Sequence, residues 1–185
     1  MLFSIENEHL KLTVDTLSAQ MMSIRSKDGC EYLWQGDPAF WAGRCPVLFP
    51  FIGRLEGKKY LCEGKEYPLG IHGFAAGAQF APDFYGPDTM VMTLAANADT
   101  MAVYPYDFVL EITYRLVGST VEVHNRVRNS GEKTMHFALG GHPGFRVPLE
   151  DGQRFEDYLL EFSEPCLPER IGFTADSVLV SGQRT

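Results

Sequence analysis

Apolar and polar residues alternate along most of this chain. The clearest run extends from Phe108 to Leu116, where every second residue is apolar. A second run extends from Leu10 to Val14, with leucine or valine at alternate positions. Successive side chains of a β-strand point to opposite faces, so an alternation of this kind predicts a strand with one buried face.

Short segments with the same period follow one another, separated by residues that favour tight turns. We expect further strands at about residues 17–25, 31–34, 59–62, 65–68, 79–85, 89–95, 121–128, 135–139, 155–162 and 178–180. The turn signals between them include Lys27-Asp28-Gly29, Glu63-Gly64 and Gly118-Ser119. Between residues 95 and 104 the pattern allows a single helical turn at most. The predicted fold class is therefore all-β, antiparallel and rich in hairpins.

Residues 38–54 differ in character from the rest of the chain. The apolar run from Pro46 to Ile52 contains two prolines. Because proline breaks helices and is confined to the edges of sheets, we expect an irregular, buried segment that crosses the protein. The segment ends at Arg54, whose guanidinium is either paired with a carboxylate inside the protein or directed into a cleft.

The stretch from Phe137 to Phe145 places one histidine in an unusual setting. Gly140 and Gly141 interrupt an alternating apolar run, and Pro143 stiffens the chain directly after His142. The imidazole is thereby held rigidly at the end of a strand, which suits a group that transfers protons. The alternative is a structural bulge whose histidine caps a backbone carbonyl.

A second histidine, His72, also lies between glycines and is followed closely by an aromatic residue. A structural histidine with satisfied hydrogen bonds is again the alternative. The similarity to the setting of His142 is what makes both of them candidates for one site. His136 lies off the apolar face of its segment and is a weaker candidate, whereas His9 and His124 are expected to face solvent.

The composition excludes several classes of function. The 185 residues are most simply one domain, 1–185, and the formal net charge of −8 with no basic run argues against a nucleic-acid partner. The four cysteines form no Cys-x-x-Cys pair, and neither a His-x-His pair nor a His-Glu helix motif is present, so we expect no metal site. Neither a phosphate loop nor a Gly-x-Ser-x-Gly elbow occurs.

The amino terminus carries acids where a signal peptide would need a basic region. No apolar run approaches the length of a membrane helix. We therefore expect a cytoplasmic protein with reduced thiols and no membrane partner. The sequence predicts no particular oligomeric state.

The candidate chemistry rests on three side chains that each follow an apolar segment. If Arg54, His72 and His142 converge at one cleft, they supply a proton donor, a second polar contact and a fixed cation. This set favours metal-free acid–base chemistry on a small polar ligand. The aromatic residues available to cover the faces of a sugar ring are Trp41, Phe74 and Phe145.

Three motifs in a fixed order resemble the aldose 1-epimerase (galactose mutarotase) family, and its LacX-like branch most closely. They are Pro46 to Arg54, then His72-Gly73-Phe74, then Gly140 to Phe145. The resemblance implies a β-sandwich of the galactose mutarotase-like (supersandwich) type. It also implies interconversion of the α and β anomers of a free aldohexose, without a cofactor.

The resemblance further implies roles for individual residues. His142 matches the general acid that protonates the ring oxygen. His72 and Arg54 match positions that contact the sugar near the reacting centre, and His72 is the second catalytic candidate. Phe74 and Phe145 are the candidate aromatic contacts to the substrate. A histidine suits the acid role because its unperturbed pKa, near 6.5, lets it give and regain a proton at neutral pH.

One part of the family pattern has no match. The glutamate that acts as general base, and an acidic residue that binds sugar hydroxyls, lie in a carboxy-terminal motif, and the chain ends at Thr185 before either is expected. The acids that follow His142 are in other contexts (Glu150, Asp151, Glu161 and Glu164). We therefore expect a chain that lacks its carboxy-terminal portion and has weak or no mutarotase activity, and expect a version extended through the glutamate to be active.

Two alternatives stay open. The same cleft could serve a carbohydrate-binding domain without catalysis. It could also serve a sugar-phosphate (hexose-6-phosphate) 1-epimerase of the same fold, which needs extra cations near the far end of the sugar. The cations near the motifs are Arg44, Lys58, Lys59 and Arg146.

Overall fold

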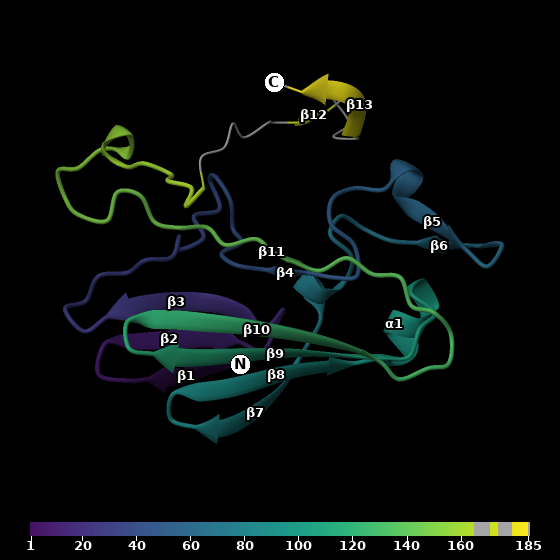
Figure 1. The fold of residues 1–185 in the computed structure, drawn as a ribbon, viewed down its shortest axis with the longest axis horizontal. Helices are drawn as coiled ribbons and strands as arrows, with labels where there is room; N and C mark the ends of the chain where they lie inside the picture. Colours follow the sequence, from purple (N-terminus) through teal and green to yellow (C-terminus); the bar gives the residue numbers. More distant parts are fainter. Residues whose placement is uncertain (165–170, 174–178, 185) are drawn as a thin grey trace.

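Two antiparallel sheets form the body of the protein in the computed structural model, which describes residues 1–164, 171–173 and 179–184 (Figure 1). The first sheet has the order β1-β2-β3, with β1 at Leu2–Glu6, β2 at Leu10–Asp15 and β3 at Gln20–Ser26. The second has the order β10-β9-β8-β7, with β7 at Ala81–Gly86, β8 at Thr89–Ala95, β9 at Phe108–Val117 and β10 at Thr120–Asn129.

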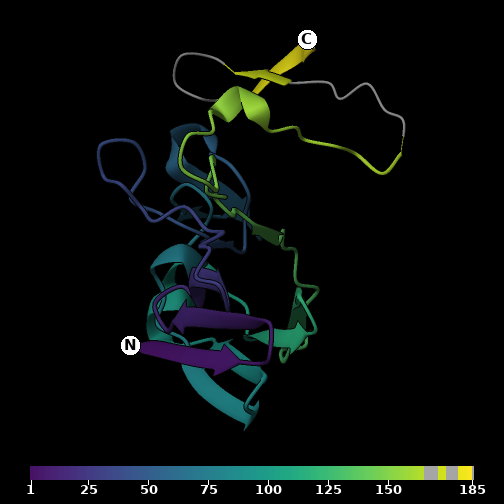
Figure 2. The ribbon, with the colours of Figure 1, turned by 90° about the vertical axis from the view of Figure 1, so that its left-hand side faces the viewer.

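Three strand pairs lie outside these sheets. They are β4 (Val47–Leu48) with β11 (Gly140–Gly141), β5 (Lys59–Cys62) with β6 (Lys65–Pro68), and β12 (Ile171–Phe173) with β13 (Leu179–Arg184). Both ribbon views show the β4–β11 pair to one side of the two large sheets (Figures 1 and 2). This pair is the part of the fold that matters most for the candidate site.

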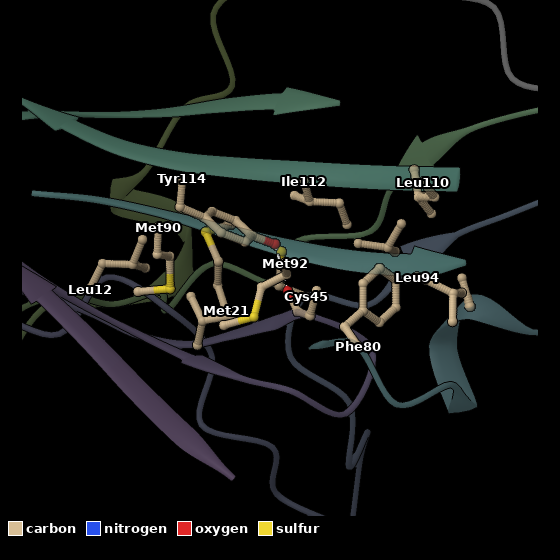
Figure 3. Packing of buried hydrophobic residues seen from close by; sticks show 14 of the residues in the cluster. Leu12, Met21, Cys45, Phe80, Met90, Met92, Leu94, Leu110, Ile112 and Tyr114 are labelled. Carbon is tan, nitrogen blue, oxygen red and sulfur yellow. Dashed lines mark hydrogen bonds between the residues drawn. The ribbon is translucent and has the colours of Figure 1, made fainter. Parts of the chain in front are cut away.

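The core lies between the two large sheets. Every second residue of β9 points into it, and Phe108, Leu110 and Ile112 are all fully buried. Leu12 of β2 belongs to the same core cluster, and Figure 3 shows it beside Met90 of β8. Tyr114 of β9 also holds the turn that leads into β3, because its hydroxyl donates a hydrogen bond to the Ala19 carbonyl at 2.5 Å. The arrangement is an antiparallel β-sandwich, so the predicted all-β fold class is confirmed.

Two predicted hairpins are present where their turn signals placed them, whereas the Lys27-Asp28-Gly29 turn is followed only by an isolated bridge between Arg25 and Glu31. Val117 pairs with Thr120 across the Gly118-Ser119 turn, and ten residues of β9 pair with ten of β10. Cys62 pairs with Lys65 across Glu63-Gly64. Residues 38–54 are irregular apart from the two residues of β4, also as predicted.

The helix between the second sheet's strands is longer than the single turn that the pattern allowed. Helix α1 covers Ala98–Val103. The Asn97 side chain accepts hydrogen bonds from the Asp99 and Thr100 backbone, and the Thr100 hydroxyl accepts one from the Asn97 backbone. This capping box stabilises a helix start that the alternation of apolar residues does not reveal. None of the helices in the described ranges is long and apolar enough to cross a membrane.

Three predicted strands are wrong or reduced. Residues 155–162 contain a short 3₁₀ turn, η3 (Phe155–Asp157), and no strand; Leu159 is 94% exposed. Residues 31–34 and 135–139 form at most isolated bridges. A regular strand needs a partner that supplies backbone hydrogen bonds along the whole segment. These segments have only scattered ones, such as those from the Tyr32 N–H to the Ile24 carbonyl and from the Ala138 N–H to the Pro50 carbonyl. Of the predicted 178–180 strand, Val178 lies outside the described residues, and β13 begins at Leu179.

Candidate active site

The β4–β11 pair brings the two proline-containing motifs together. Gly140 pairs with Leu48 and Gly141 with Val47. The two partners in each pair are about 90 residues apart in the chain. Directly after this pairing, the His142 backbone N–H donates to the Pro46 carbonyl at 3.2 Å. His142 is therefore the first residue after β11, and this hydrogen bond fixes its backbone against the crossing segment.

The same crossing segment also holds the second histidine motif. Phe49 forms a parallel bridge with Gly73, and the Phe49 carbonyl accepts hydrogen bonds from the backbone N–H groups of Phe74 and Ala75 at 3.0 and 3.1 Å. Gly73 has a φ of +77°, and a Cβ at this position would lie 2.3 Å from the Phe49 oxygen. Only glycine lets the chain approach this closely.

We expect Gly73→Ala to lower the free energy of unfolding by about 1–3 kcal/mol more than Gly118→Ala. Both glycines have a positive φ, +77° and +55°, but a Cβ at Gly118 would meet nothing within 4 Å. The strain of a positive φ is thus common to both variants, and the difference isolates the overlap with the Phe49 carbonyl. Urea unfolding of the two variants measures it, and equal losses would contradict this contact.

His72 is fixed by two reciprocal hydrogen bonds with Gly53. The His72 backbone N–H donates to the Gly53 carbonyl at 2.9 Å, and the Gly53 N–H donates to His72 Nδ1 at 3.0 Å. Nδ1 is therefore an acceptor, and the proton of the neutral ring lies on Nε2, which is free to donate to a ligand. His72 also has a φ of +63°, a strained conformation for a residue other than glycine and one that is typical of functional sites.

The two imidazoles lie beside each other. Their ring centroids are 5.9 Å apart, with an angle of 62° between the ring planes. The His142 side chain is exposed and the His72 side chain is half-buried. The structure thus brings together two residues that are 70 positions apart in the sequence, on one surface that solvent reaches.

Arg54 lies next to this pair with a free side chain. It is exposed, and its guanidinium has neither a hydrogen bond nor an ion pair within residues 1–164. It follows directly on Gly53, which holds the His72 ring, and its charge acts on the pKa of His72. Of the two alternatives from the sequence, pairing with a carboxylate is not found within residues 1–164, where the guanidinium is an exposed cation near His72.

The electrostatic setting favours the neutral form of His72. Partial burial, then the neighbouring His142, then the Arg54 guanidinium lower the pKa of His72 below its ordinary value of 6.5. Protonation of Nδ1 would also break its hydrogen bond from Gly53. In the neutral ring of His72, Nδ1 accepts the hydrogen bond from Gly53 and Nε2–H remains a donor.

We expect this shift to make the fold less stable in acid. Because the unfolded chain takes up the proton first, the free energy of unfolding falls once the pH drops below about 6.5 and levels off below the folded-state pKa. His72→Asn removes this part of the slope, since asparagine tolerates a positive φ and does not titrate in this range. His9→Asn is the control, because His9 is 54% exposed. Urea unfolding at several pH values measures both; an unchanged slope in His72→Asn contradicts the assignment.

Phe74 and Phe145 lie apart from the imidazole surface. The Phe74 ring packs against Phe49, Tyr104 and Phe108, with centroid separations of 5.9 to 6.0 Å, so it anchors the turn that carries His72. Phe145 is 64% exposed and lines a hollow of about 750 Å³ to which neither imidazole contributes. Their predicted contacts with a substrate stay predictions, and these positions give them no support.

Two further residues are placed by the structure. Trp41, which the sequence offered only as a cover for a sugar, has its ring centroid 4.9 Å from that of His142. His136 is exposed and lines a second hollow, of about 850 Å³, to which His72 and His142 do not contribute. The only signal for Trp41 in the sequence is an aromatic residue within the irregular segment that ends at Arg54.

Within residues 1–164, the two imidazoles have no carboxylate partner. No carboxylate in the described part of the chain forms a hydrogen bond or ion pair with the His72 or His142 ring. No group of three or more His, Cys, Asp or Glu side chains among the described residues is arranged to hold a metal ion. The surface therefore supplies donors and a cation, without a carboxylate base in contact with either ring.

Comparison with known protein families gives a match over most of the chain. Residues 1–171 match the family described as aldose 1-epimerase. The plasmid-encoded and chromosomal LacX proteins of Lactococcus lactis subsp. lactis are 38% and 37% identical over 170 residues. These residues are 89% of this chain and 57% of each LacX protein, so the chain spans little more than half the length of these relatives.

Solved structures with related sequences have the same fold. A galactose mutarotase related enzyme from Lactobacillus acidophilus superimposes with a TM-score of 0.94 at 34% identity, over 100% of this chain and 62% of that one. A galactose mutarotase-like protein from Lactobacillus casei gives a TM-score of 0.78 at 36% identity, over 82% of this chain and 52% of that one. The galactose mutarotase-like architecture that the motifs predicted is confirmed.

Proposed function

Because this chain belongs to the aldose 1-epimerase family, we propose that Arg54, His72 and His142 bind a free aldose and that this site interconverts its α and β anomers. The observation that carries the proposal is the pair of imidazoles, 5.9 Å apart, near a guanidinium that has no ion pair within residues 1–164. A pyranose is small enough for its ring oxygen and neighbouring hydroxyls to meet both rings within hydrogen-bond distance.

His142 is the general acid in this proposal. Its imidazolium gives a proton to the ring oxygen, the bond between C1 and that oxygen breaks, and the C1 hydroxyl loses its proton to a base. The open-chain aldehyde rotates about the C1–C2 bond. Closure on the other face returns the ring-oxygen proton to His142, so the reaction moves two protons and one C–O bond and leaves no net change in oxidation state.

His72 and Arg54 orient the sugar. His72 offers one donor, Nε2–H, because Nδ1 is occupied by the Gly53 N–H. The Arg54 guanidinium offers several donors at a fixed charge, and it stabilises oxygen atoms on which negative charge develops. Partial burial, then His142 and Arg54, lower the pKa of His72, which favours the neutral form of this ring as a hydrogen-bond donor to the sugar.

In this proposal, the transfer of the C1 hydroxyl proton to a base limits the rate of mutarotation. No carboxylate in residues 1–164 forms a hydrogen bond or ion pair with either imidazole, and in this proposal water accepts the proton of the C1 hydroxyl. A positioned base contributes on the order of 10²–10⁴ in rate, which corresponds to roughly 3–5 kcal/mol of barrier. We therefore expect slow but measurable mutarotation.

The proposal favours a free aldose over a sugar phosphate. Arg44 Nη1 donates to the Met22 carbonyl and to Gln35 Oε1, both at 2.7 Å. Lys59 is paired with Glu66 at 2.8 Å. Two of the four candidate cations are thus engaged elsewhere, which supports a substrate without a phosphate group.

Polarimetry on freshly dissolved α-D-galactose and α-D-glucose, together with thermal unfolding in the presence of each sugar, tests the proposal. A raised melting temperature with sugar and a rate above the uncatalysed one support it. A raised melting temperature with no added rate identifies a carbohydrate-binding domain instead. Neither effect at millimolar sugar refutes the proposed site.

A further inference from the structure

We propose that Trp41 is a positioning residue for His142: its indole holds the imidazole in the orientation from which it donates a proton. This role rests on the proposed function of His142 as the general acid. The two ring centroids are 4.9 Å apart and the ring planes meet at 50°, a separation within the range of favourable aromatic contacts. Of the two rings that contact His142 among the described residues, Trp41 is the nearer, since His72 is 5.9 Å away.

In the part of the chain that the structure describes, the His142 side chain has no hydrogen bond or ion pair to fix its orientation. Its backbone N–H is held by the Pro46 carbonyl, but its ring nitrogens form no hydrogen bond within the described residues. The side chain is also exposed. Ring packing against Trp41 and His72 is therefore what limits rotation of the imidazole, and a general acid needs a narrow range of orientations.

Trp41, in contrast, is firmly held. Its backbone N–H donates to the Asp37 carbonyl at 2.8 Å, and its carbonyl accepts a hydrogen bond from Trp34 Nε1 at 2.7 Å. The indole fills space that two glycines leave open. A Cβ at Gly43 would lie 2.6 Å from Cζ2 of the indole, and a Cβ at Gly144 would lie 2.9 Å from Cζ3.

These contacts place the indole between the crossing segment and the segment that follows His142. Gly43 belongs to the crossing segment that ends at Arg54, and Gly144 lies two residues after His142. The Gly144 backbone N–H donates to the Arg44 carbonyl at 2.7 Å, which closes the chain around the indole. Trp41 thus fixes the imidazole from a position that is itself set by the two motifs.

Tryptophan fluorescence tests the contact without any need for turnover. The chain contains two tryptophans, Trp34 and Trp41. A protonated imidazole against an indole quenches its emission and lies within the range of a cation–π contact. The titratable and charged groups around the pair are His72 and Arg54 on the side of His142, and Asp37 next to Trp41. We expect emission to fall as the pH drops through the histidine range, between about 8 and 5.

Three variants assign this fluorescence step. It is expected to disappear in His142→Asn and in Trp41→Phe, where Trp34 is the remaining emitter, and to persist in His72→Asn. A step that is retained in His142→Asn or in Trp41→Phe, or its absence from the unaltered protein, overturns the proposal. Melting temperatures of the variants confirm that each is folded.

Kinetics then separate positioning from direct binding of the sugar. If Trp41 positions His142, Trp41→Ala lowers kcat roughly threefold to tenfold and leaves KM within about twofold, and Trp41→Phe restores most of kcat because a phenyl ring keeps the packing. If Trp41 is instead a platform for the sugar, KM rises and kcat changes little, which overturns the positioning role. A protein with the fluorescence step and no turnover would refute the proposed catalysis and leave the Trp41–His142 contact established.

Discussion

Replacing His142 by asparagine is expected to reduce the catalysed rate of mutarotation by about 10²- to 10⁴-fold, or to the uncatalysed background. Asparagine is close to histidine in polarity but cannot donate a proton to the ring oxygen near neutral pH. The ring of His142 is exposed and forms no hydrogen bond within the described residues, so its loss removes a chemical group and little structure. Polarimetry with α-D-galactose measures kcat/KM of both proteins.

His124→Asn is the matched control for this substitution. His124 is 68% exposed on β10, and the group paired with its ring is Glu122. We expect its kcat/KM to equal that of the unaltered protein. A His142→Asn protein whose rate matches that of the His124→Asn protein would remove His142 from the mechanism.

Replacing Phe49 by alanine is expected to lower the free energy of unfolding by about 3–5 kcal/mol. The side chain is fully buried, and its ring contacts those of Phe74, Tyr104, Phe108 and Phe137, with centroid separations of 5.1 to 5.9 Å. Its removal leaves a cavity that these rings cannot fill, in addition to the lost burial of apolar surface. Urea unfolding measures the loss.

Phe40→Ala provides the comparison. Phe40 is 83% exposed and has one aromatic neighbour, Trp34, at 6.4 Å. We expect a loss of less than about 1 kcal/mol for this variant. Equal losses at Phe40 and Phe49 would mean that the aromatic cluster is not the support of the crossing segment.

The pattern of apolar residues determined the body of the fold because the alternating runs of the two large sheets have partner strands. The run of β9 is flanked by β8 and β10, and its buried face meets β2, as the alternation required. The 155–162 segment has a comparable apolar content but no partner strand among the described residues, and its Leu159 and Leu160 are 94% and 85% exposed. Whether a segment finds a partner strand depends on the fold of the whole chain, so the local pattern of apolar residues does not predict it.

The histidine pair could be predicted because unusual local chemistry marked both members. Glycines beside His72 and His142 correspond to real close approaches, with Phe49 in one case and with the crossing segment in the other. Trp41 carried no such mark. Its contact with His142 depends on a Gly144 that leaves room for the indole, and sequence spacing alone does not show that these segments meet.

The sequence also did not predict where the rings of Phe74 and Phe145 point. Phe74 and Phe145 follow a histidine at a similar spacing, two and three residues later. In the structure one ring packs into the aromatic core and the other faces a separate hollow. The direction of a side chain after a turn depends on the backbone angles of that turn, such as the positive φ of Gly73.

A titration of the histidine imidazoles with galactose, followed by ¹H–¹⁵N NMR, tests most directly whether one sugar contacts both rings. The account predicts that the His72 and His142 signals move together with a single dissociation constant. The His9 and His124 signals, from rings that are 54% and 68% exposed and remote from Arg54 in the sequence, are expected to stay in place. Movement of one member of the pair alone, or of neither at saturating sugar, would contradict a shared site.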